Sequence, residues 1–389
     1  MKHCIACGTR LPEQILFELN EAPASAQDIP DQHTVKADRG ITLRLYQCGG
    51  CGLVQLDSPP VAYYKDVIRA GGFSTTMTGL RRRQYRHLIT GYHLEHKKFI
   101  EVGCGRGEFL QVLNEFPVAA CGIEHQEALV QTAVSAGLDV RQGFTETPEY
   151  DLGDRYDVFL SFNFLEHQPD PGTMLQAVYH NLKEEGMGLI TVPSLEYILA
   201  QGSYYELIRD HLAYYSFPTL RALLERNGFR VLEEELVNRD TISMIVKKDS
   251  SLYGQKKLPP QVKPVDISSL TDGYRTVREE ILALFQRLAD AGKKAAVWGA
   301  GHQGFTLAGT LGLGDKAAYI IDSAPFKQGR FAPASHLRIV SPGQAGQEPV
   351  DAIIIAAPGY TEEIAGIIRT QFGSQMQVFA LRTNHLEQL

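Results

Sequence analysis

A short apolar run meets a glycine-rich turn at Phe99-Ile100-Glu101-Val102-Gly103-Cys104-Gly105-Arg106-Gly107. The apolar part predicts a buried strand, and residues 108–116 that follow it predict a helix. Glycines at such a junction let a ligand approach the backbone and let the helix pack closely against the strand. The stretch therefore predicts one βα unit of an α/β fold.

Alternating strands and helices continue beyond this turn. Further strands are expected at 119–124, 156–162 and 188–192, with a helix over 126–136. After an amphipathic helix over 267–291, a second set has expected strands at 295–299, 318–322, 351–356 and 377–381. Strands separated by helices of this length form βαβ units around a parallel sheet. The chain is therefore predicted to hold two separate α/β units.

The composition limits the possible function classes. The chain has 389 residues, of which 44% are hydrophobic and 21% are charged, as in a globular protein of two or three domains. Its formal charge of −7 argues against a general binder of nucleic acid or of anionic membranes. No apolar run is long enough to span a membrane, and no secretory signal is recognised. We expect a cytoplasmic protein, and its oligomeric state stays open.

Four of the six cysteines form two C-x-x-C pairs, Cys4 with Cys7 and Cys48 with Cys51. In a reducing compartment this spacing favours a metal over a disulfide. A glycine follows each pair and lets the backbone turn toward sulfur, which suits a closed tetrahedral zinc site. We therefore predict structural Zn²⁺ at these cysteines. A redox role and four ordinary thiols are the alternatives.

Three polar residues suggest that the first glycine turn binds a ligand. Glu101 lies two residues before Gly103, Glu124 ends the next expected strand, and Asn163 follows the strand expected at 156–162. A carboxylate at the position of Glu124 is able to accept hydrogen bonds from two ribose hydroxyls. NAD is one alternative ligand, although dinucleotide sites favour G-x-G-x-x-G and this turn reads G-x-G-x-G. A turn that serves only the packing of the helix is the other alternative.

This set of residues resembles the class I methyltransferases that depend on S-adenosylmethionine (SAM). Their first motif, E-x-G-x-G, matches residues 101–105, their ribose-binding acid matches Glu124, and the segment after their fourth strand matches residues 164–170. The resemblance implies a SAM site formed by Glu101, Gly103, Gly105, Gly107, Glu124 and Asn163.

Two histidines follow carboxylates in loops after expected strands, at Glu166-His167 and at Asp210-His211. Ligands of α/β proteins bind in loops at the carboxyl ends of the strands. A neighbouring acid is able to set the tautomer and basicity of a histidine for proton abstraction. Either histidine is also suited to cap a helix or to fill a wall, and the geometry must decide.

Taken over nearly its whole length, the chain resembles the sugar C-methyltransferases. These enzymes methylate a carbon beside the ketone of a nucleotide-linked 4-keto deoxysugar. Their Glu-His pair, followed by an aromatic residue and Ser, matches residues 210–216 with Asp in place of Glu, and their His-x-Pro segment matches residues 167–169. The resemblance implies that His211 is the base, that Asp210 orients it, that His167 stabilises the enolate oxygen, and that Tyr214 contacts the substrate.

The same resemblance implies three domains. A zinc-binding module would cover residues 1–72, and a class I methyltransferase domain with a Rossmann-like sheet would cover 73–255. A C-terminal Rossmann-like α/β domain would cover 256–389, after a proline-containing linker composition around Pro259 and Pro260.

A second glycine turn, at residues 297–304, reads G-x-G-x-x-G through Gly299, Gly301 and Gly304, and Asp322 ends the next expected strand. Taken alone, this is a dinucleotide fingerprint. In the resembling family the domain instead helps to hold the nucleotide of the sugar substrate. Substrate nucleotide, NAD and no ligand are the three interpretations of this turn.

Two other functions remain open from the sequence. One is an O- or N-methyltransferase that acts on another small metabolite. The other is a non-catalytic nucleotide-binding protein that keeps SAM as a structural ligand.

Overall fold

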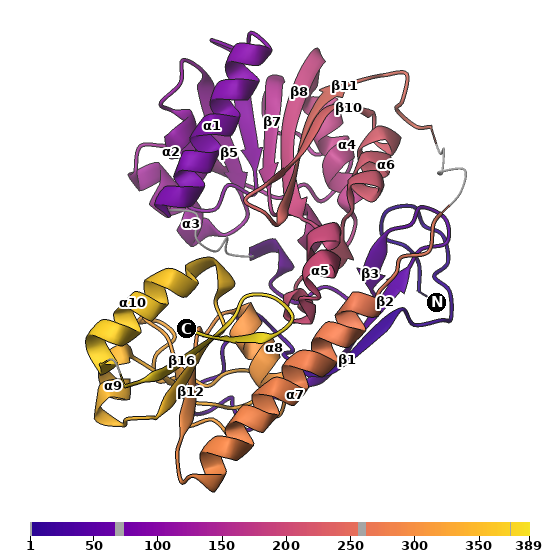
Figure 1. Ribbon diagram of the computed structural model, residues 1–389. Helices are drawn as coiled ribbons and strands as arrows, with labels where there is room; N and C mark the ends of the chain where they lie inside the picture. Colours follow the sequence, from indigo (N-terminus) through magenta and orange to yellow (C-terminus); the bar gives the residue numbers. More distant parts are fainter. Residues whose placement is uncertain (1, 67–73, 256–261, 374) are drawn as a thin grey trace.

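This computed structural model describes residues 2–66, 74–255, 262–373 and 375–389. Three β-sheets organise these residues (Figure 1). The predicted linker prolines, Pro259 and Pro260, and the predicted boundary at residues 72 and 73 lie outside the described residues. The sheets agree with the predicted α/β architecture of a central methyltransferase sheet between two smaller parts.

The N-terminal sheet is antiparallel and has the order β1-β2-β3-β9. Its strands are β1 (Phe17–Ala22), β2 (Ile41–Gln47), β3 (Val54–Leu56) and β9 (Ala213–Tyr214). β9 comes from the central part of the chain and pairs with β3, with Ala213 opposite Gln55. The segment that carries His211 therefore leads directly into the edge strand of the N-terminal sheet.

The central sheet has seven strands in the order β10-β11-β8-β7-β4-β5-β6. Five are parallel: β4 (Lys98–Val102), β5 (Ala119–Glu124), β6 (Val140–Gln142), β7 (Tyr156–Phe162) and β8 (Leu182–Pro193). An antiparallel hairpin of β10 (Phe229–Val237) and β11 (Thr241–Lys248) extends the sheet beyond β8. The strand predicted at 188–192 is the buried part of β8, because its earlier residues Lys183–Glu185 are exposed and charged.

Helices cover both faces of this sheet (Figure 1). One face carries α1 (Thr75–Gly91), α2 (Glu108–Leu113) and α3 (Glu127–Ser135). The other carries α4 (Pro171–Asn181) and α6 (Phe217–Arg226). Four short elements lie near the carboxyl edge of the strands: η1 (Tyr64–Asp66), η2 (Leu165–His167), α5 (Leu195–Gln201) and η3 (Tyr204–Glu206).

The C-terminal sheet has the order β14-β13-β12-β15-β16-β17, and only β17 is antiparallel. Its strands are β12 (Ala295–Trp298), β13 (Ile320–Ile321), β14 (Ile339–Val340), β15 (Ala352–Ile355), β16 (Gln377–Leu381) and β17 (Leu386–Gln388). Its helices are α8 (His302–Thr310), α9 (Pro342–Gln347), the short η4 (Pro358–Tyr360) and α10 (Thr361–Phe372). The four strands predicted here are all present, although that at 318–322 is reduced to two residues.

The long helix α7 (Ser268–Asp290) confirms the amphipathic helix predicted over 267–291. Its buried residues, Leu270, Val277, Ile281, Leu284 and Leu288, recur at helical spacing. They share one apolar core with strands of the N-terminal sheet, with α5 and with the C-terminal sheet. Each such side chain contributes roughly 1.5–3 kcal/mol by leaving water. α7 therefore ties both ends of the chain to the region around α5 and η3.

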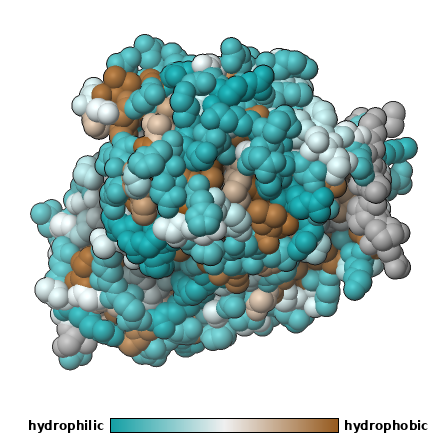
Figure 2. Space-filling model, turned by 90° about the horizontal axis from the view of Figure 1, so that it is seen from above, coloured by the Kyte–Doolittle hydropathy of each residue, from teal (hydrophilic) through white to brown (hydrophobic). Residues whose placement is uncertain are grey.

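The face of the molecule in Figure 2 is mainly hydrophilic, with apolar residues in small separate groups. Among the described residues, no helix combines the length and the apolar character needed to cross a membrane.

Candidate active site

The first glycine turn joins β4 to α2 at the carboxyl edge of the central sheet. Gly103, Gly105 and Gly107 have φ angles of 72°, 59° and 77°, which L side chains rarely adopt. A Cβ atom on Gly103 would lie 2.8 Å from the ring of Phe164, and one on Gly107 would lie 2.2 Å from Leu138. The sequence therefore needs glycine here both for conformation and for space.

Glu124 ends β5 beside this turn and is buried. Its two carboxylate oxygens accept hydrogen bonds from the backbone N–H groups of Gly105 and Gln126, each at 2.9 Å. The acid is thus held against the glycine turn, at the position predicted for ribose binding.

A hollow opens between the ends of β4 and β5 and the loops that follow β6 and β7. It is lined by Lys65, Val102, Gly103, Ile123, Glu124, His125, Gly143, Phe144, Thr145 and Phe164. Of the six predicted cofactor residues, Gly103 and Glu124 belong to this lining, and Glu101, Gly105, Gly107 and Asn163 do not. Glu101 is fully buried in β4, and the side chain of Asn163 accepts a hydrogen bond from Thr191 Oγ1 at 3.0 Å. The glycine turn and Glu124 fit a small adenosyl-type ligand, whereas Asn163 is engaged by the sheet.

Several residues at the rim of this hollow were not found by the sequence analysis. Lys65 of η1 forms an ion pair with Glu146, and Asp66 lies 2.6 Å from Nδ1 of His125. The ring of Tyr64 contacts that of Phe144 edge-on at 5.8 Å. For His125 and Phe144 the available signal is position, because residues directly after β5 and β6 lie at the same edge as the glycine turn. The residues of η1 carry no such signal.

The two predicted histidines lie together next to this hollow. His167 belongs to η2, which follows the lining residue Phe164, and His211 lies just before β9. The ring centroids of His167 and His211 are 4.8 Å apart, and the rings meet edge to face. The carboxylate of Glu166 and both imidazoles have ligand atoms within 4.8 Å of one another. The structure thus brings both histidines and this acid into one cluster.

The contacts of His167 define its tautomer. Its Nδ1 lies 2.9 Å from the backbone oxygen of Asp210, and a carbonyl only accepts, so Nδ1–H is the donor. Burial lowers the pKa of His167, and the contact with Asp210 only partly opposes this effect. The neutral ring therefore offers a lone pair at Nε2. This argues against the predicted role of His167 as a donor to an enolate oxygen.

Burial lowers the pKa of His211 well below its usual value, and the nearby imidazoles of His167 and His302 lower it further. His302 comes from α8 of the C-terminal domain. A neutral imidazole has a lone pair on one ring nitrogen and is able to accept a proton there.

Asp210 does not orient His211 through its carboxylate in the way the sequence suggested. Its Oδ1 accepts a hydrogen bond from the backbone N–H of Ala26 at 2.9 Å, and its Oδ2 accepts one from the hydroxyl of Tyr63 at 2.7 Å. Asp210 instead ties the N-terminal module to the histidine segment and holds His167 through its carbonyl. Adjacent side chains on an irregular loop point in different directions, which the sequence does not reveal.

Tyr214 is buried and its hydroxyl is already used. It accepts a hydrogen bond from the N–H of Ile208 at 2.9 Å and lies 3.2 Å from the carbonyl of the same residue. Its ring centroid is 6.2 Å from that of His211. Tyr214 therefore forms a wall beside the histidine, and what it offers to a substrate is its ring.

The second glycine turn joins β12 to α8. Gly299 has a φ angle of 123°, and a Cβ atom on Gly304 would lie 2.0 Å from the carbonyl oxygen of Gly299. Gly301 has an ordinary φ of −108° and open space around it. Two of the three predicted glycines are thus required for packing, and Gly301 leaves room for a ligand.

Asp322 is engaged by the loop around it. Its Oδ2 accepts hydrogen bonds from the N–H of Ala300 at 2.8 Å and from Nζ of Lys327 at 3.3 Å. Its Oδ1 accepts one from the N–H of Ala324 at 2.8 Å. Asp322 therefore stabilises the turn through a cation and two amides.

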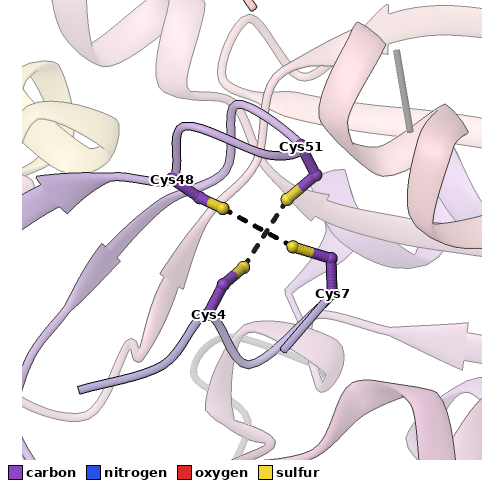
Figure 3. A group of neighbouring side chains, drawn as sticks. All are labelled: Cys4, Cys7, Cys48 and Cys51. Carbon is purple, nitrogen blue, oxygen red and sulfur yellow. Dashed lines mark hydrogen bonds between the residues drawn. The ribbon is translucent and has the colours of Figure 1, made fainter. Parts of the chain in front are cut away.

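The four paired cysteines converge in the N-terminal module, as Figure 3 shows. Sγ of Cys4 lies 3.5 Å from that of Cys51, and Sγ of Cys7 lies 3.5 Å from that of Cys48. Disulfide sulfurs are about 2.05 Å apart, so these are separate thiols. Four sulfurs about 3.8 Å apart would surround a tetrahedral Zn²⁺ with bonds of about 2.3 Å, so the donor set fits zinc.

Two regions of the chain match known protein families. Residues 77–234 match a methyltransferase domain, and residues 267–378 match a C-methyltransferase C-terminal domain. The C-methyltransferase NovU of Streptomyces niveus is 24% identical over 283 residues, which are 68% of this chain and 67% of that protein.

Other matches cover smaller shares of the chain. A ubiquinone biosynthesis O-methyltransferase of Pseudomonas entomophila is 31% identical over 99 residues, which are 24% of this chain and only 43% of that protein. A solved SAM-dependent methyltransferase of Clostridium acetobutylicum aligns over 44% of this chain and 92% of its own, with 14% identity and a TM-score of 0.37.

Proposed function

We propose that this SAM-dependent methyltransferase methylates a carbon beside the ketone of a nucleotide-linked deoxysugar. The match of its C-terminal part to a C-methyltransferase C-terminal domain supports transfer to carbon. Such a carbon holds its proton tightly, so the reaction needs a base next to the methyl donor. The observation that carries the proposal is the pair of neutral imidazoles, His167 and His211, beside the hollow at the first glycine turn.

In this proposal SAM occupies the hollow formed by the glycine turn. Gly103, Gly105 and Gly107 allow close approach to the backbone, and Glu124 accepts hydrogen bonds from the ribose. Bound SAM supplies an electrophilic methyl group. The remaining groups of the reaction belong to the protein.

His211 acts as the base. Its lone pair takes the proton from the carbon next to the ketone, and the electrons of the C–H bond remain on the resulting enolate. His167 lies edge-on to the His211 ring and fixes its orientation, while the carbonyl of Asp210 fixes His167. A positioned base of this kind contributes about 10²–10⁴-fold to the rate.

The nucleotide of the substrate would be held by the C-terminal domain. The second glycine turn precedes α8, and Gly301 leaves open space at the helix start. Backbone N–H groups at such a position suit a phosphate.

The four cysteines would hold one structural Zn²⁺, with no open position for chemistry. Metal analysis of the purified chain should find about one zinc ion per chain, and Cys51→Ala should unfold the N-terminal module more than it alters the SAM site. A folded protein with four free thiols and no metal would disprove this assignment.

The alternative is transfer to oxygen or nitrogen of another metabolite. The similarity to ubiquinone O-methyltransferases favours it, but that similarity covers only 99 residues, which are 24% of this chain. The match at residues 267–378 is to a C-methyltransferase domain and supports transfer to carbon.

The test is to incubate the full chain with ¹³C-methyl SAM and a panel of thymidine- and uridine-diphosphate 4-keto-6-deoxyhexoses. The product is then read by ¹³C NMR, in which a methyl on carbon and one on oxygen have well-separated shifts. We expect a carbon-bound methyl next to the ketone for at least one sugar. A methyl on oxygen or nitrogen, or turnover only with acceptors that lack a ketone, would overturn the proposal.

A further inference from the structure

The short helix η1 of the N-terminal module contacts the rim of the hollow at the first glycine turn. The rings of Tyr64 and Phe144 meet edge-on with their centroids 5.8 Å apart. Lys65 lines the hollow, and its Nζ lies 5.0 Å from the centroid of the Phe144 ring. Just before η1, the hydroxyl of Tyr63 donates to Asp210 at 2.7 Å. The match to the methyltransferase domain begins only at residue 77, so these contacts come from outside that domain.

Asp66, the last residue of η1, fixes the ring of His125. Its Oδ1 lies 2.6 Å from Nδ1 of His125, and an ionised carboxylate only accepts, so the Nδ1–H donates. The lone pair of the neutral ring is then on Nε2. His125 directly follows Glu124 and lines the same hollow, so Nε2 is the ring nitrogen that remains for a ligand.

A second polar atom of this hollow indicates a ligand. Thr145 is 3% exposed and lines the hollow, and its Oγ1 has no hydrogen-bond partner among the described residues. Buried hydroxyls are nearly always hydrogen-bonded, so a ligand is expected to supply the partner. The rings of Phe144 and Phe164, with centroids 6.2 Å apart, give the hollow apolar walls. Apolar walls with a few polar atoms are typical of a site for a small molecule with a flat ring.

We infer that η1 completes the cofactor site, with Asp66 as a positioning residue that holds His125 to accept a hydrogen bond from the 6-amino group of adenine. The inference rests on the proposed placement of SAM in this hollow and is independent of the methyl acceptor. Thr145 supplies a second hydrogen bond to the same base. Because Nε2 offers a lone pair, a 6-oxo group in place of the amino group would be repelled. The site is therefore selective for an aminopurine.

The experiment is calorimetric titration of the full chain, without a methyl acceptor, with S-adenosylhomocysteine and with S-inosylhomocysteine, in which an oxo group replaces the 6-amino group. It is run at pH 8.5, where an ordinary imidazole is neutral. The wild type should bind the adenosyl ligand at least about tenfold more tightly, because a site built around a hydrogen bond rejects the analogue that cannot form it. His125→Phe should reduce this preference to about threefold or less.

Asp66→Ala separates positioning from a structural role. Without the carboxylate, the proton is free to move from Nδ1 to Nε2 of His125, which then donates to a 6-oxo group. Binding of the inosyl ligand should therefore tighten by about threefold or more, while binding of the adenosyl ligand weakens. Loss of structure would weaken both ligands alike and leave the preference unchanged. Asp66→Asn keeps an acceptor oxygen and should retain most of the wild-type preference.

Asp154→Ala is the matched control. Asp154 forms a similar ion pair with Lys98, but at the amino edge of the same sheet, so its loss should leave both affinities unchanged. Thr145→Val removes the hydroxyl and keeps the shape of the side chain. It should weaken binding of the adenosyl ligand by about threefold to tenfold, as expected for one lost hydrogen bond.

A preference that falls in both His125→Phe and Asp66→Ala supports the inference, even if no sugar is methylated on carbon and the proposed acceptor is wrong. Equal binding of the two ligands by the wild type, a full preference in Asp66→Ala, or an unchanged affinity in Thr145→Val overturns it. Each of these results would do so even if the product assay shows a methyl on carbon and the proposed function stands.

Discussion

The two glycine turns of this protein have similar sequences but different surroundings. Each follows a strand, precedes a helix, and has an acid at the end of the next strand. In the first turn, Glu124 accepts two backbone N–H groups and borders a hollow. In the second, Asp322 also pairs with the Nζ of Lys327 and stabilises its own loop.

A glycine fingerprint therefore specifies a strand–turn–helix backbone but not its ligand. The ligand depends on whether the acid is turned toward a hollow or toward the protein. We therefore assign the cofactor to the first turn. In our proposal the second turn holds the nucleotide of the substrate and lies where the C-terminal domain contacts the methyltransferase domain.

Substitution of His211 should change the rate most, if the reaction takes place at the carboxyl edge of the central sheet. His211→Ala should lower kcat by about 10²-fold or more and leave SAM affinity nearly unchanged, because it removes the base but not the cofactor site. Steady-state kinetics and calorimetry measure the two quantities. His167→Ala should give a smaller loss, and wild-type turnover by both variants would exclude histidine as the base.

The next effect compares the two acids directly. Glu124→Ala should weaken SAM binding by about 1–3 kcal/mol, as expected when a charged acceptor is lost. Asp322→Ala is the matched control and should lower the stability of the C-terminal domain without changing SAM affinity. Calorimetric titration with SAM decides the matter, and equal affinities for wild type and Glu124→Ala would mean that the ribose site is misassigned.

A third effect compares positions within the second turn. Gly299 has a φ angle of 123°, and a Cβ atom there would lie 3.0 Å from the carbonyl oxygen of Ala356, whereas Gly301 has open space. Gly299→Ala should therefore cost about 1–3 kcal/mol of folding free energy. Gly301→Ala should change it by less than about 0.5 kcal/mol. Urea denaturation measures both, and equal losses would contradict the described backbone.

The smallest effect concerns pH. The pKa of His167 is lowered by burial, so the unfolded chain binds more protons than the folded one just below pH 6.5. The free energy of unfolding should therefore fall as the pH decreases from about 6.5 toward the folded pKa, by at most about 1.4 kcal/mol per unit. His167→Gln should reduce this slope in urea denaturation between pH 5 and 7, and an identical slope would show that His167 is not buried as a neutral ring.

Much of the central fold was predictable because its signals are local. The runs that form β4, β5 and β7 are short, apolar and bounded by polar turns, and the apolar spacing of α7 marks one helix face. The hairpin β10–β11 and strand β9 were not predicted. β10 is largely exposed and charged, and β9 forms only because β3 pairs with it across more than 150 residues of sequence.

The site was predictable in its composition but not in its contacts. Sequence placed His167 and His211 after strands, and the structure brings them together. It did not reveal that the Asp210 carboxylate turns to Ala26 and Tyr63. Nor did it show that Glu206 of η3 lies 3.3 Å from His302 of α8, because long-range packing decides which loops of two domains meet.

The most direct test of the central claim is exchange of the substrate proton with solvent. The sugar that the methylation assay selects is incubated with the enzyme in D₂O and S-adenosylhomocysteine, which has no methyl group to transfer, and the carbon-bound proton next to the ketone is followed by ¹H NMR. We predict that the wild type exchanges this proton and that His211→Ala does not. Retention of the proton with the wild type, under conditions in which SAM is turned over, would contradict carbanion formation and C-methylation.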